Sequence, residues 1–406
     1  MSSCNELADY EWLTGSAAGA LLRELACGDE PLHVAATRLR RELSAKRAHL
    51  VLEQLELRKR AAAKFSRAHA MYFTRLGLEQ ATDAWIAAHK ARRFEDRGPA
   101  ADLCCGIGGD LLALAEAGPT LGVDRDPIAA SLAIANGQAL GLDVTVRIHD
   151  IAELNVEEFA AWHLDPDRRP AGKRTSSLEW SSPGLDDVER LLAAVPHAAI
   201  KLAPAADVPD GWESDCELEW ISRNRECRQL VAWHGDLAVA TGLRRATVLS
   251  NDGRSMRTIV GQPDAAVPYV DRPDRFVFEP DPAVLAAWLT GTLASEYGLS
   301  VFSAGVAYLS GSVAIDDPAL ACFEIEDVLS FQTRVLAAHL RERNVGRIEI
   351  KKRGVDHDPD ALRKKLRLRG DRAATLLLTK LSGKHVAILA RRVESNVPAL
   401  ALVSET

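Results

Sequence analysis

The residues best suited to chemistry lie in a glycine-rich turn at positions 101–110, which read Ala-Asp-Leu-Cys-Cys-Gly-Ile-Gly-Gly-Asp. A predicted strand enters the turn and a predicted helix leaves it, so backbone N–H groups are open to a ligand where Gly106 and Gly108 lack side chains. Asp124 follows Asp102 by 22 residues, at the end of the next predicted strand, where a carboxylate can bind both ribose hydroxyls. The pattern predicts a nucleoside cofactor, although the two glycines alone would fit a tight turn without a ligand equally well.

Two kinds of nucleoside cofactor fit this turn, and the details favour one of them. A dinucleotide-binding turn needs a third glycine at position 111, where this chain has Leu111, and the phosphate-binding lysine of a P-loop is missing. S-adenosylmethionine has no phosphate, but its methionine part carries a charged amino group. Asp102, on the strand before the turn, is placed to meet that group. We therefore predict S-adenosylmethionine as the cofactor.

These residues resemble, in order and spacing, the class I S-adenosylmethionine-dependent methyltransferases. The first motif of that family, an acidic residue followed by x-x-x-Gly-x-Gly, is matched by Asp102, Gly106 and Gly108. Asp124 matches the acidic residue of the second strand, and Asp150 stands where the family contacts the adenine amino group after the third strand. The resemblance implies a methyltransferase whose cofactor-binding residues are Asp102, Cys104, Gly106, Gly108, Asp124 and Asp150.

A second polar group, at positions 165–169, reads Asp-Pro-Asp-Arg-Arg and follows a short predicted strand at the carboxyl edge of the sheet. Amine-methylating relatives have Asp/Asn-Pro-Pro-aromatic here, so the resemblance implies that Asp165 and Pro166 orient the methyl acceptor. Asp167 replaces the second proline, and Arg168 replaces the aromatic residue that would stack on a base. Arg168 and Arg169 suit a phosphate or a guanine edge, or equally an ion pair with a neighbouring carboxylate. The predicted catalytic residues are Asp165, Pro166 and Arg168.

The order Asp-Pro-x-Arg also resembles RNA uracil-C5 methyltransferases, whose chemistry needs a cysteine thiolate that adds to the pyrimidine ring. In those relatives the cysteine follows the fifth strand, where residues 201–204 of this chain read Lys-Leu-Ala-Pro. The nearest cysteines in the sequence, Cys216 and Cys227, are better explained as ordinary sheet residues. We therefore disfavour methylation at C5.

The composition excludes several classes of protein. Seven cysteines among 406 residues, without a repeated short spacing, form neither a disulfide framework nor a pair of zinc-binding CxxC motifs. The N-terminus lacks the apolar segment of a signal peptide, and no stretch approaches the ~18 apolar residues of a spanning helix. We predict a cytoplasmic protein without a metal or a membrane partner, and the sequence gives no indication of oligomeric state.

The net charge of −7 argues against a simple polyanion binder, but this total hides a local asymmetry. Residues 38–67 carry +7 and residues 341–372 carry +6, which leaves −20 for the rest of the chain. The first basic stretch is as easily explained as a solvated helix face. The second follows a predicted strand and continues into a helix, an arrangement that suits a phosphate backbone. Its candidate RNA-binding residues are Lys351, Lys352, Arg353, Lys364 and Lys365.

The elements that would position these residues can be predicted from changes in residue composition along the chain. Residues 33–90 are rich in good helix formers and contain no proline, which predicts an all-helical N-terminal domain. From residue 98, apolar runs alternate with amphipathic stretches, as in a β/α sheet domain. There we predict strands at 100–104, 119–124, 144–148, 161–164 and 197–203, helices at 109–117, 127–140 and 185–195, and antiparallel segments at 217–234 and 246–260.

The C-terminal part predicts a smaller mixed structure. A strand at 275–278, a helix at 282–297 and a strand at 306–309 form a β-α-β piece, followed by helices at 331–343 and 359–366 and strands at 347–351, 374–380 and 384–392. The predicted domains are 1–96 (helical), 97–272 (methyltransferase), 273–322 (small β-α-β, ferredoxin-like) and 323–406 (THUMP-like). The predicted fold class is α/β, a Rossmann-like class I methyltransferase domain with an all-helical N-terminal domain and a small α+β C-terminal region.

The last assignment depends on a second resemblance. The stretch from Ile348 to Arg392, with Lys351-Lys352-Arg353-Gly354 after its first strand, looks like the THUMP-like domain of a group of bacterial class I methyltransferases, and residues 78–82 of the helical part, Leu-Glu-Gln-Ala-Thr, also resemble that group. True THUMP domains bind structured RNA, typically transfer RNA. The resemblance implies methylation of a base in structured RNA, either tRNA or rRNA. The alternatives are a non-catalytic RNA-binding protein that keeps the fold, and a small-molecule or protein methyltransferase.

Overall fold

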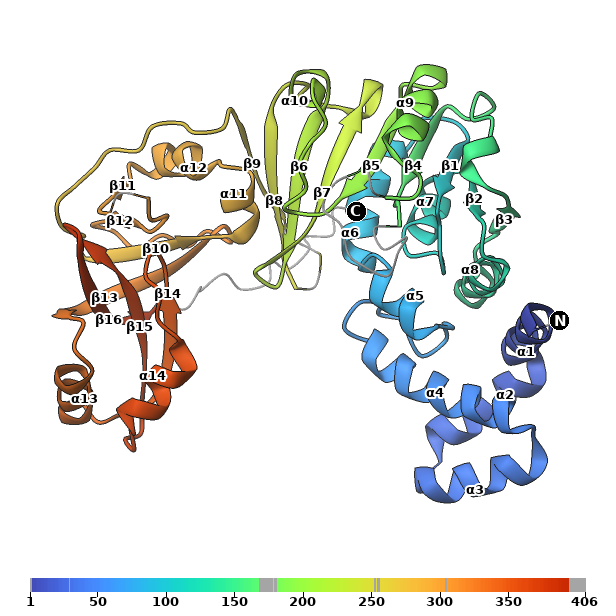
Figure 1. Cartoon of the computed structure of the whole chain (residues 1–406), viewed down its shortest axis with the longest axis horizontal. Coiled ribbons are helices and arrows are strands. Elements are labelled where there is room, and N and C mark those ends of the chain that lie inside the picture. The colour runs from blue at the N-terminus through green and yellow to red at the C-terminus, as the bar shows by residue number, and fades with distance from the viewer. Residues whose placement is uncertain are drawn as a thin grey trace, which may run out of the picture. The chain divides into compact units, whose positions relative to one another are not determined.

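The structure, a computed structural model, describes residues 2–28, 30–167, 178, 181–251, 253, 256–303 and 305–393. The chain divides into two units, which are described separately: Met1–Leu218 with Gln229–Gly242, and Glu219–Arg228 with Leu243–Thr406. Figure 1 labels the helices and strands of both. None of the helices in these described ranges is long and apolar enough to cross a membrane.

A parallel sheet forms the centre of the first unit. Its parallel strands are β1 (Ala100–Leu103), β2 (Thr120–Asp124), β3 (Thr145–Ile148), β4 (Ala161–Leu164) and β5 (Ala198–Leu202), and β7 (Glu226–His234) pairs antiparallel with β5. The strand order is β3-β2-β1-β4-β5-β7, so the chain proceeds outward in one direction from β1 and then in the other from β4. Ligands of open α/β sheets bind at such a switch point, outside the carboxyl ends of the strands.

The helices between these strands begin and end where the sequence supplies caps. They are α7 (Leu111–Ala117), α8 (Pro127–Leu140) and α9 (Leu185–Ala194). Asp126 accepts a hydrogen bond from the backbone N–H of Ile128 at the start of α8, Pro127 occupies the first turn, and Gly141 ends the helix with a φ of +78°. Each of these residue types suits its position. The start of a helix has N–H groups without a partner, so an acceptor such as Asp is favourable there, and proline adds no further N–H. The end favours a residue that adopts a positive φ, as glycine does.

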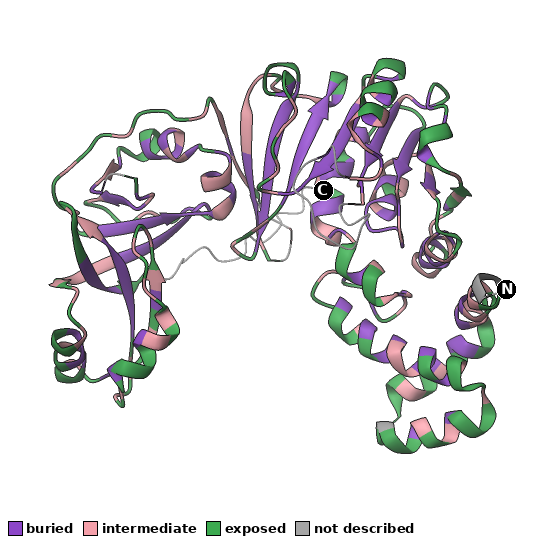
Figure 2. Cartoon of the chain, in the orientation of Figure 1, coloured by how far each residue is buried: buried purple, intermediate pink, exposed green. Residues whose placement is uncertain are grey.

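The N-terminal part is helical, as the sequence predicts. It comprises α1 (Ser2–Thr14), α2 (Ser16–Cys27), α3 (Leu32–Glu42), α4 (Ala45–Ala61), α5 (Arg75–Gln80) and α6 (Ala84–Ala91). Leu55 and Leu57 of α4 belong to the same hydrophobic core as Leu111 and Leu132 of the sheet domain. The helices and the sheet domain are therefore parts of one packed unit, and Figure 2 shows the buried strands and the exposed outer helix faces.

The second unit contains two groups of strands. The strands β6 (Glu217–Arg223), β8 (Arg244–Leu249) and β9 (Met256–Gly261) are hydrogen-bonded neighbours in the order β6-β8-β9. A seven-stranded sheet has the order β11-β12-β10-β13-β16-β15-β14, from β10 (Phe276–Pro280), β11 (Ser300–Val301), β12 (Leu309–Gly311), β13 (Leu320–Ser330), β14 (Val345–Lys352), β15 (Arg372–Leu381) and β16 (Lys384–Arg392). The helices of the second unit are α11 (Pro282–Ala286), α12 (Thr290–Tyr297), α13 (Thr333–Glu342) and α14 (Pro359–Leu366). The short helix α10 (Trp212–Asp215) belongs to the first unit.

Both faces of the seven-stranded sheet are buried along β15. Leu376 and Leu378 pack into a core with α13 and α14, whereas Leu377 packs into a second core with Phe302 and Phe323. This follows from the period of two in a strand, which sends alternate side chains to opposite faces. The continuous apolar run of β15 is therefore explained by burial on both sides.

Several predicted elements need correction. Residues 217–234 form two strands, because Asn224 and Arg225 adopt a left-handed turn with φ of +56° and +57°. The predicted helix at 282–297 is interrupted at Trp288, whose φ is +60°, and gives α11 and α12. The strand expected at 306–309 lies at 309–311, and the prediction missed β13 altogether. Trp288 gives no turn signal, whereas Asn224, a residue that tolerates the left-handed conformation, was a signal that the prediction did not use.

Candidate functional site

The glycine-rich turn joins β1 to α7 at the switch point of the sheet (Figure 1). Cys104, Gly106 and Gly108 have φ values of +59°, +54° and +93°. Glycine adopts this conformation freely, but for a residue with a Cβ it costs roughly 1–2 kcal/mol, so the turn is strained at Cys104. A Cβ built on Gly106 would have no described atom within 4 Å. The turn therefore presents open backbone at the place where the sequence predicts the cofactor.

Asp124 and Asp150 end two neighbouring strands at this edge. The Asp124 carboxylate accepts hydrogen bonds from the N–H of Gly106 at 2.8 Å and from the N–H of Asp126 at 2.9 Å. Burial raises its pKa, which these two hydrogen bonds oppose. Asp150 is exposed and caps a short 3-10 helix by accepting from the N–H of Ala152 at 3.0 Å. The structure thus brings Asp124 against the turn and leaves Asp150 open to solvent beyond β3.

Asp102 faces the interior of the unit. It is 1% exposed, and its Oδ1 lies 2.7 Å from Nδ1 of His163 on β4, a histidine that the sequence analysis did not select. Oδ2 has no hydrogen-bond partner among the described residues. Because Oδ2 is also buried, the structure does not expose Asp102 for the predicted contact with a ligand ammonium group.

Asp102 is the first member of a buried chain of polar contacts, which we call the buried relay. The imidazole Nε2 of His163 lies 2.8 Å from the Lys90 ammonium, which lies 2.7 Å from Asp110 Oδ1. The hydroxyl of Thr82 donates to Asp110 Oδ2 at 2.6 Å and accepts from the Lys201 ammonium at 3.0 Å. Lys201 also forms a short ion pair with Asp165 Oδ2. The relay therefore runs from Asp102, in the first predicted motif, to Asp165, in the second.

The electrostatics of the relay follow from burial and pairing. Burial lowers the pKa of Lys90, while Asp110 opposes that change. Burial alone would raise the pKa of Asp110, but Lys90, His163 and Lys201 together hold it well below its ordinary value. Because Nε2 of His163 faces an ammonium group, we assign Nε2 as the acceptor and Nδ1 as the protonated nitrogen that donates to Asp102.

Asp165 is the member of the relay that reaches the surface. Its backbone N–H donates to the carbonyl of Leu103 at 3.2 Å, which fixes the start of the second motif beside the end of β1. Pro166 is buried, and Asp167 accepts from the Gln80 amide at 3.4 Å. The side chain of Asp165 is 23% exposed, and its Oδ1 receives no hydrogen bond from any described residue. Arg168 and Arg169 lie outside the described residues.

The charges at this edge suit a cationic ligand. Burial and the nearby carboxylates Asp124, Asp165 and Asp102 raise the pKa of the Cys104 thiol well above its ordinary value. The edge therefore combines a backbone that is left open at Gly106, a carboxylate at the end of β2 and an excess of negative charge. S-adenosylmethionine carries a sulfonium and an ammonium group besides its ribose, so the residues present fit it. Among the described residues, no cluster of His, Cys, Asp and Glu could hold a metal ion.

Sequence reasoning missed the interior partners of this site. His163 and Lys201 each interrupt a short apolar strand whose residues are all buried. A titratable side chain is almost never fully buried without a partner, so a polar residue inside such a strand was the available signal. Lys90 and Thr82 gave no comparable signal, because Lys90 lies in the last turn of α6, where a cation is common, and Thr82 lies in the loop before that helix.

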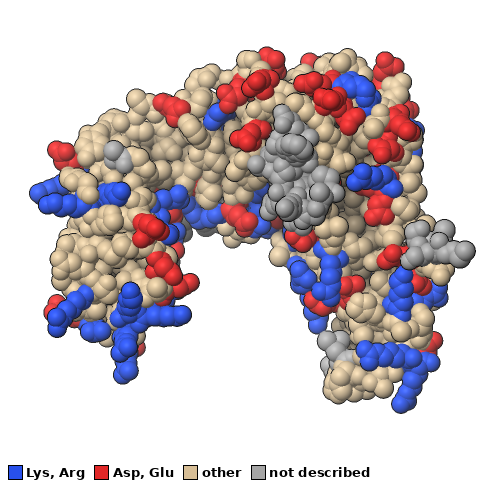
Figure 3. All heavy atoms as spheres, viewed as in Figure 1, with Lys and Arg blue, Asp and Glu red and all other residues tan. Residues whose placement is uncertain are grey.

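The candidate RNA-binding residues fall into two groups. Lys351 pairs with Glu279 at 2.7 Å and Arg353 lies 3.5 Å from the same carboxylate, so both are held by an internal partner. Lys352, Lys364 and Lys365 are exposed, and none has an ion pair with another described residue. Figure 3 shows Lys and Arg side chains gathered over the region of α13 and α14. The second group is the one placed to meet an external anion.

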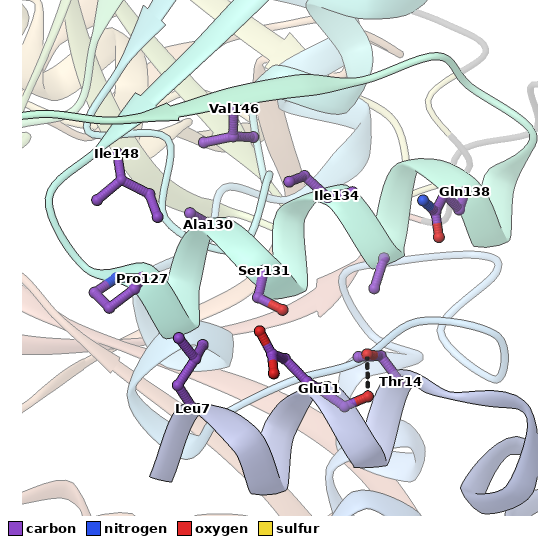
Figure 4. Close-up of a pocket in the computed structure, with 11 residues that line it drawn as sticks. Leu7, Glu11, Thr14, Pro127, Ala130, Ser131, Ile134, Gln138, Val146 and Ile148 are labelled. Carbon is purple, nitrogen blue, oxygen red and sulfur yellow. Dashed lines mark hydrogen bonds between the residues drawn. The ribbon is translucent and has the colours of Figure 1, made fainter. Parts of the chain in front are cut away.

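A pocket of about 290 Å³ lies elsewhere in the first unit, between α1, α8 and β3. Figure 4 shows its lining, in which Leu7 and Glu11 of α1 face Pro127 and Ser131 of α8, and Ile148 of β3. Neither the glycine-rich turn nor Asp124 lines it. The pocket is therefore separate from the candidate cofactor site.

Comparison with known proteins agrees with this geometry. Residues 320–392 match the family model described as "THUMP domain-like". Proteins from two strains of Mycobacterium tuberculosis, both described as uncharacterized S-adenosylmethionine-dependent methyltransferases, are 33% identical over 347 residues, which is 82% of this chain and 93% of theirs. A crystal structure from Porphyromonas gingivalis W83, described as a methyltransferase, covers 96% of this chain and 98% of its own with a TM-score of 0.75 at 22% identity. The predicted fold class and the THUMP-like resemblance are confirmed.

The buried relay can be tested through stability. Asp110→Asn leaves the Lys90 ammonium buried without its carboxylate, which should lower the free energy of unfolding by about 3–5 kcal/mol. Lys90→Met combined with Asp110→Asn should recover part of that loss, because no unpaired charge remains. Urea denaturation measures Asp110→Asn, Lys90→Met and the double variant, and Asp143→Asn, at an exposed position, serves as the control with a change within about 0.5 kcal/mol. A double variant as unstable as the sum of the two single variants would contradict the pairing.

The same variant gives a test by pH. Because the fold lowers the pKa of Asp110, its stabilisation is complete above the ordinary carboxyl value of about 3.9 and is lost as the pH falls towards the lower folded-state value. The wild type should therefore lose stability below about pH 4 more steeply than Asp110→Asn. Parallel slopes for the two proteins would show that Asp110 is not held ionised.

Proposed function

The chain belongs to the S-adenosylmethionine-dependent methyltransferases, and from that premise we propose that it methylates a base in structured RNA, either tRNA or rRNA. The observation that carries the proposal is the THUMP-like domain at residues 320–392, with the exposed cations Lys352, Lys364 and Lys365. Known THUMP domains bind structured RNA, and exposed cations after a strand and along a helix suit its phosphates. A protein with this substrate and cofactor would act in the cytoplasm.

The proposed roles at the cofactor edge follow from the contacts of each residue. Bound S-adenosylmethionine supplies a methyl group that is already activated by its sulfonium. Gly106 leaves the backbone open to the nucleoside, Gly108 allows the turn to pack closely on Leu112, and Asp124 offers its carboxylate to the ribose hydroxyls. Asp165 Oδ1, which no described residue occupies, accepts a hydrogen bond from the methyl acceptor, and Pro166 adds its carbonyl. Correct alignment of acceptor and methyl group can lower the barrier by several kcal/mol.

The cofactor assignment is tested by ligand-induced stabilisation. S-adenosylhomocysteine at ~100 times its dissociation constant should stabilise the wild type by about 2.7 kcal/mol, and Asp124→Ala should remove most of this effect, because the ribose loses its acceptor. The thermal shift of the wild type, of Asp124→Ala and of the exposed control Asp143→Ala measures it. An undiminished shift in Asp124→Ala would refute the role of Asp124.

The RNA assignment is tested with unmodified substrate. RNA purified from a strain that lacks this gene should accept labelled methyl groups from S-adenosylmethionine, and nucleoside mass spectrometry of the same RNA should name the missing modification. Labelling confined to proteins or metabolites would favour a small-molecule or protein methyltransferase. RNA binding without any methyl transfer would favour a binding protein that keeps the fold.

The exposed cations Lys364 and Lys365 allow a test of RNA binding that does not depend on methyl transfer. Lys364→Ala with Lys365→Ala should weaken binding of the same RNA and reduce the dependence of log affinity on log salt by ~0.7–0.9 for each phosphate that the variant no longer binds. Lys380→Ala with Lys384→Ala, at the β15–β16 turn, removes the same charge elsewhere in the domain and should leave binding unchanged. Equal effects of the two double variants would mean that only net charge matters.

A further inference from the structure

Lys201 has no role in the sequence motifs, yet it occupies a central place in the candidate site. It lies on β5, one residue before the carboxyl end of that strand, and is 7% exposed. Its ammonium group forms a short ion pair with Asp165 Oδ2 and donates to the Thr82 hydroxyl at 3.0 Å. A buried lysine is costly unless it is paired, so its position beside the acceptor-side carboxylate calls for an explanation.

The direction of the hydrogen bonds fixes the role of Lys201 as a donor. The single proton of the Thr82 hydroxyl is donated to Asp110 at 2.6 Å, so the oxygen of Thr82 can only accept from Lys201. Asp165, as a carboxylate, can likewise only accept. Lys201 therefore donates to both partners and holds one oxygen of Asp165 in place, while Oδ1 stays free of described residues.

We propose that Lys201 is a positioning residue for methyl transfer, which holds Oδ2 of Asp165 and so keeps Oδ1 turned towards the methyl acceptor. This inference rests on the proposed function, in which Asp165 receives the acceptor. The charged or titratable groups that face this pair are Cys104 from the β1–α7 turn, Lys90 from α6 and Asp110 at the start of α7.

The helical N-terminal segment completes this arrangement. Thr82 lies in the loop between α5 and α6, and the neighbouring Gln80 contacts Asp167 of the second motif. The same loop packs closely on the glycine-rich turn, since a Cβ on Gly109 would lie 2.8 Å from the Thr82 backbone nitrogen. The loop therefore borders both motifs, and through Thr82 it sets the position of Lys201.

The test compares two replacements of Lys201 by single-turnover methylation of RNA from the strain that lacks the gene. Lys201→Met should lower the rate by about 100-fold, because Asp165 is no longer held in place. Lys201→Arg keeps a donor at this position and should recover most of the rate, and the shift with S-adenosylhomocysteine should be unchanged in both. A wild-type rate in Lys201→Met would overturn the proposal.

A second pair of variants covers the case in which Lys201→Met does not fold. Thr82→Val removes the hydroxyl that holds Lys201 and should lower the methylation rate while the cofactor shift persists, whereas Thr82→Ser should behave like the wild type. Equal rates for Thr82→Val and Thr82→Ser would count against the positioning role.

A substrate-independent measurement separates this proposal from the RNA assignment. The surroundings of the Asp165 carboxylate can be followed by NMR of carboxyl-labelled aspartate, with Asp165→Asn to assign its signal. Lys201→Arg should leave the chemical shift of the Asp165 carboxyl carbon close to that of the wild type, and Lys201→Met or Thr82→Val should change it, because the hydrogen bond to Oδ2 is lost or displaced. If the wild type methylates no RNA but these differences appear, the RNA assignment fails and the role of Lys201 stands. An unchanged chemical shift in both variants overturns the role of Lys201 whatever the substrate.

Discussion

Burial of charge is the constraint on which the candidate site depends. Asp102, Lys90 and Asp110 lie in the interior of the first unit, where an ion without a partner costs several kcal/mol. Each group therefore restricts the position of the next, and the buried relay connects β1, β4 and β5 with α6, the start of α7 and the α5–α6 loop. The polar contacts between these segments therefore define the site, and the glycine-rich turn is only its exposed part.

The sequence predicted the elements whose signals are local. Gly106 and Gly108 marked the turn, Asp124 marked the end of β2, and the apolar runs marked five parallel strands. The contacts of the relay could not be read in this way, because His163 is 61 residues from Asp102 and Lys201 is 119 residues from Thr82. A pairing across such distances depends on tertiary packing, which no window of the sequence contains.

The prediction of RNA-binding residues from a count of basic residues had a similar limit. The sequence placed Lys351, Lys352 and Arg353 in one basic group, but a strand sends alternate side chains to opposite faces. Lys351 and Arg353 accordingly meet Glu279, and Lys352 is exposed. A run of cations therefore predicts how much charge a segment carries, and its secondary structure decides how much of that charge can reach a partner.

The sign of the charge at each place also constrains how an RNA substrate can be held. Counted by formal charge, the relay carboxylates Asp102, Asp110 and Asp165, with Asp124 beside them, outnumber the two lysines of the relay. An edge of this sign attracts a cationic cofactor and repels phosphates. An RNA substrate, as proposed above, would then have to be held by cations that lie outside the cofactor edge. The exposed lysines of the THUMP-like domain meet this requirement, because their charge is not neutralised by internal partners as that of Lys351 is.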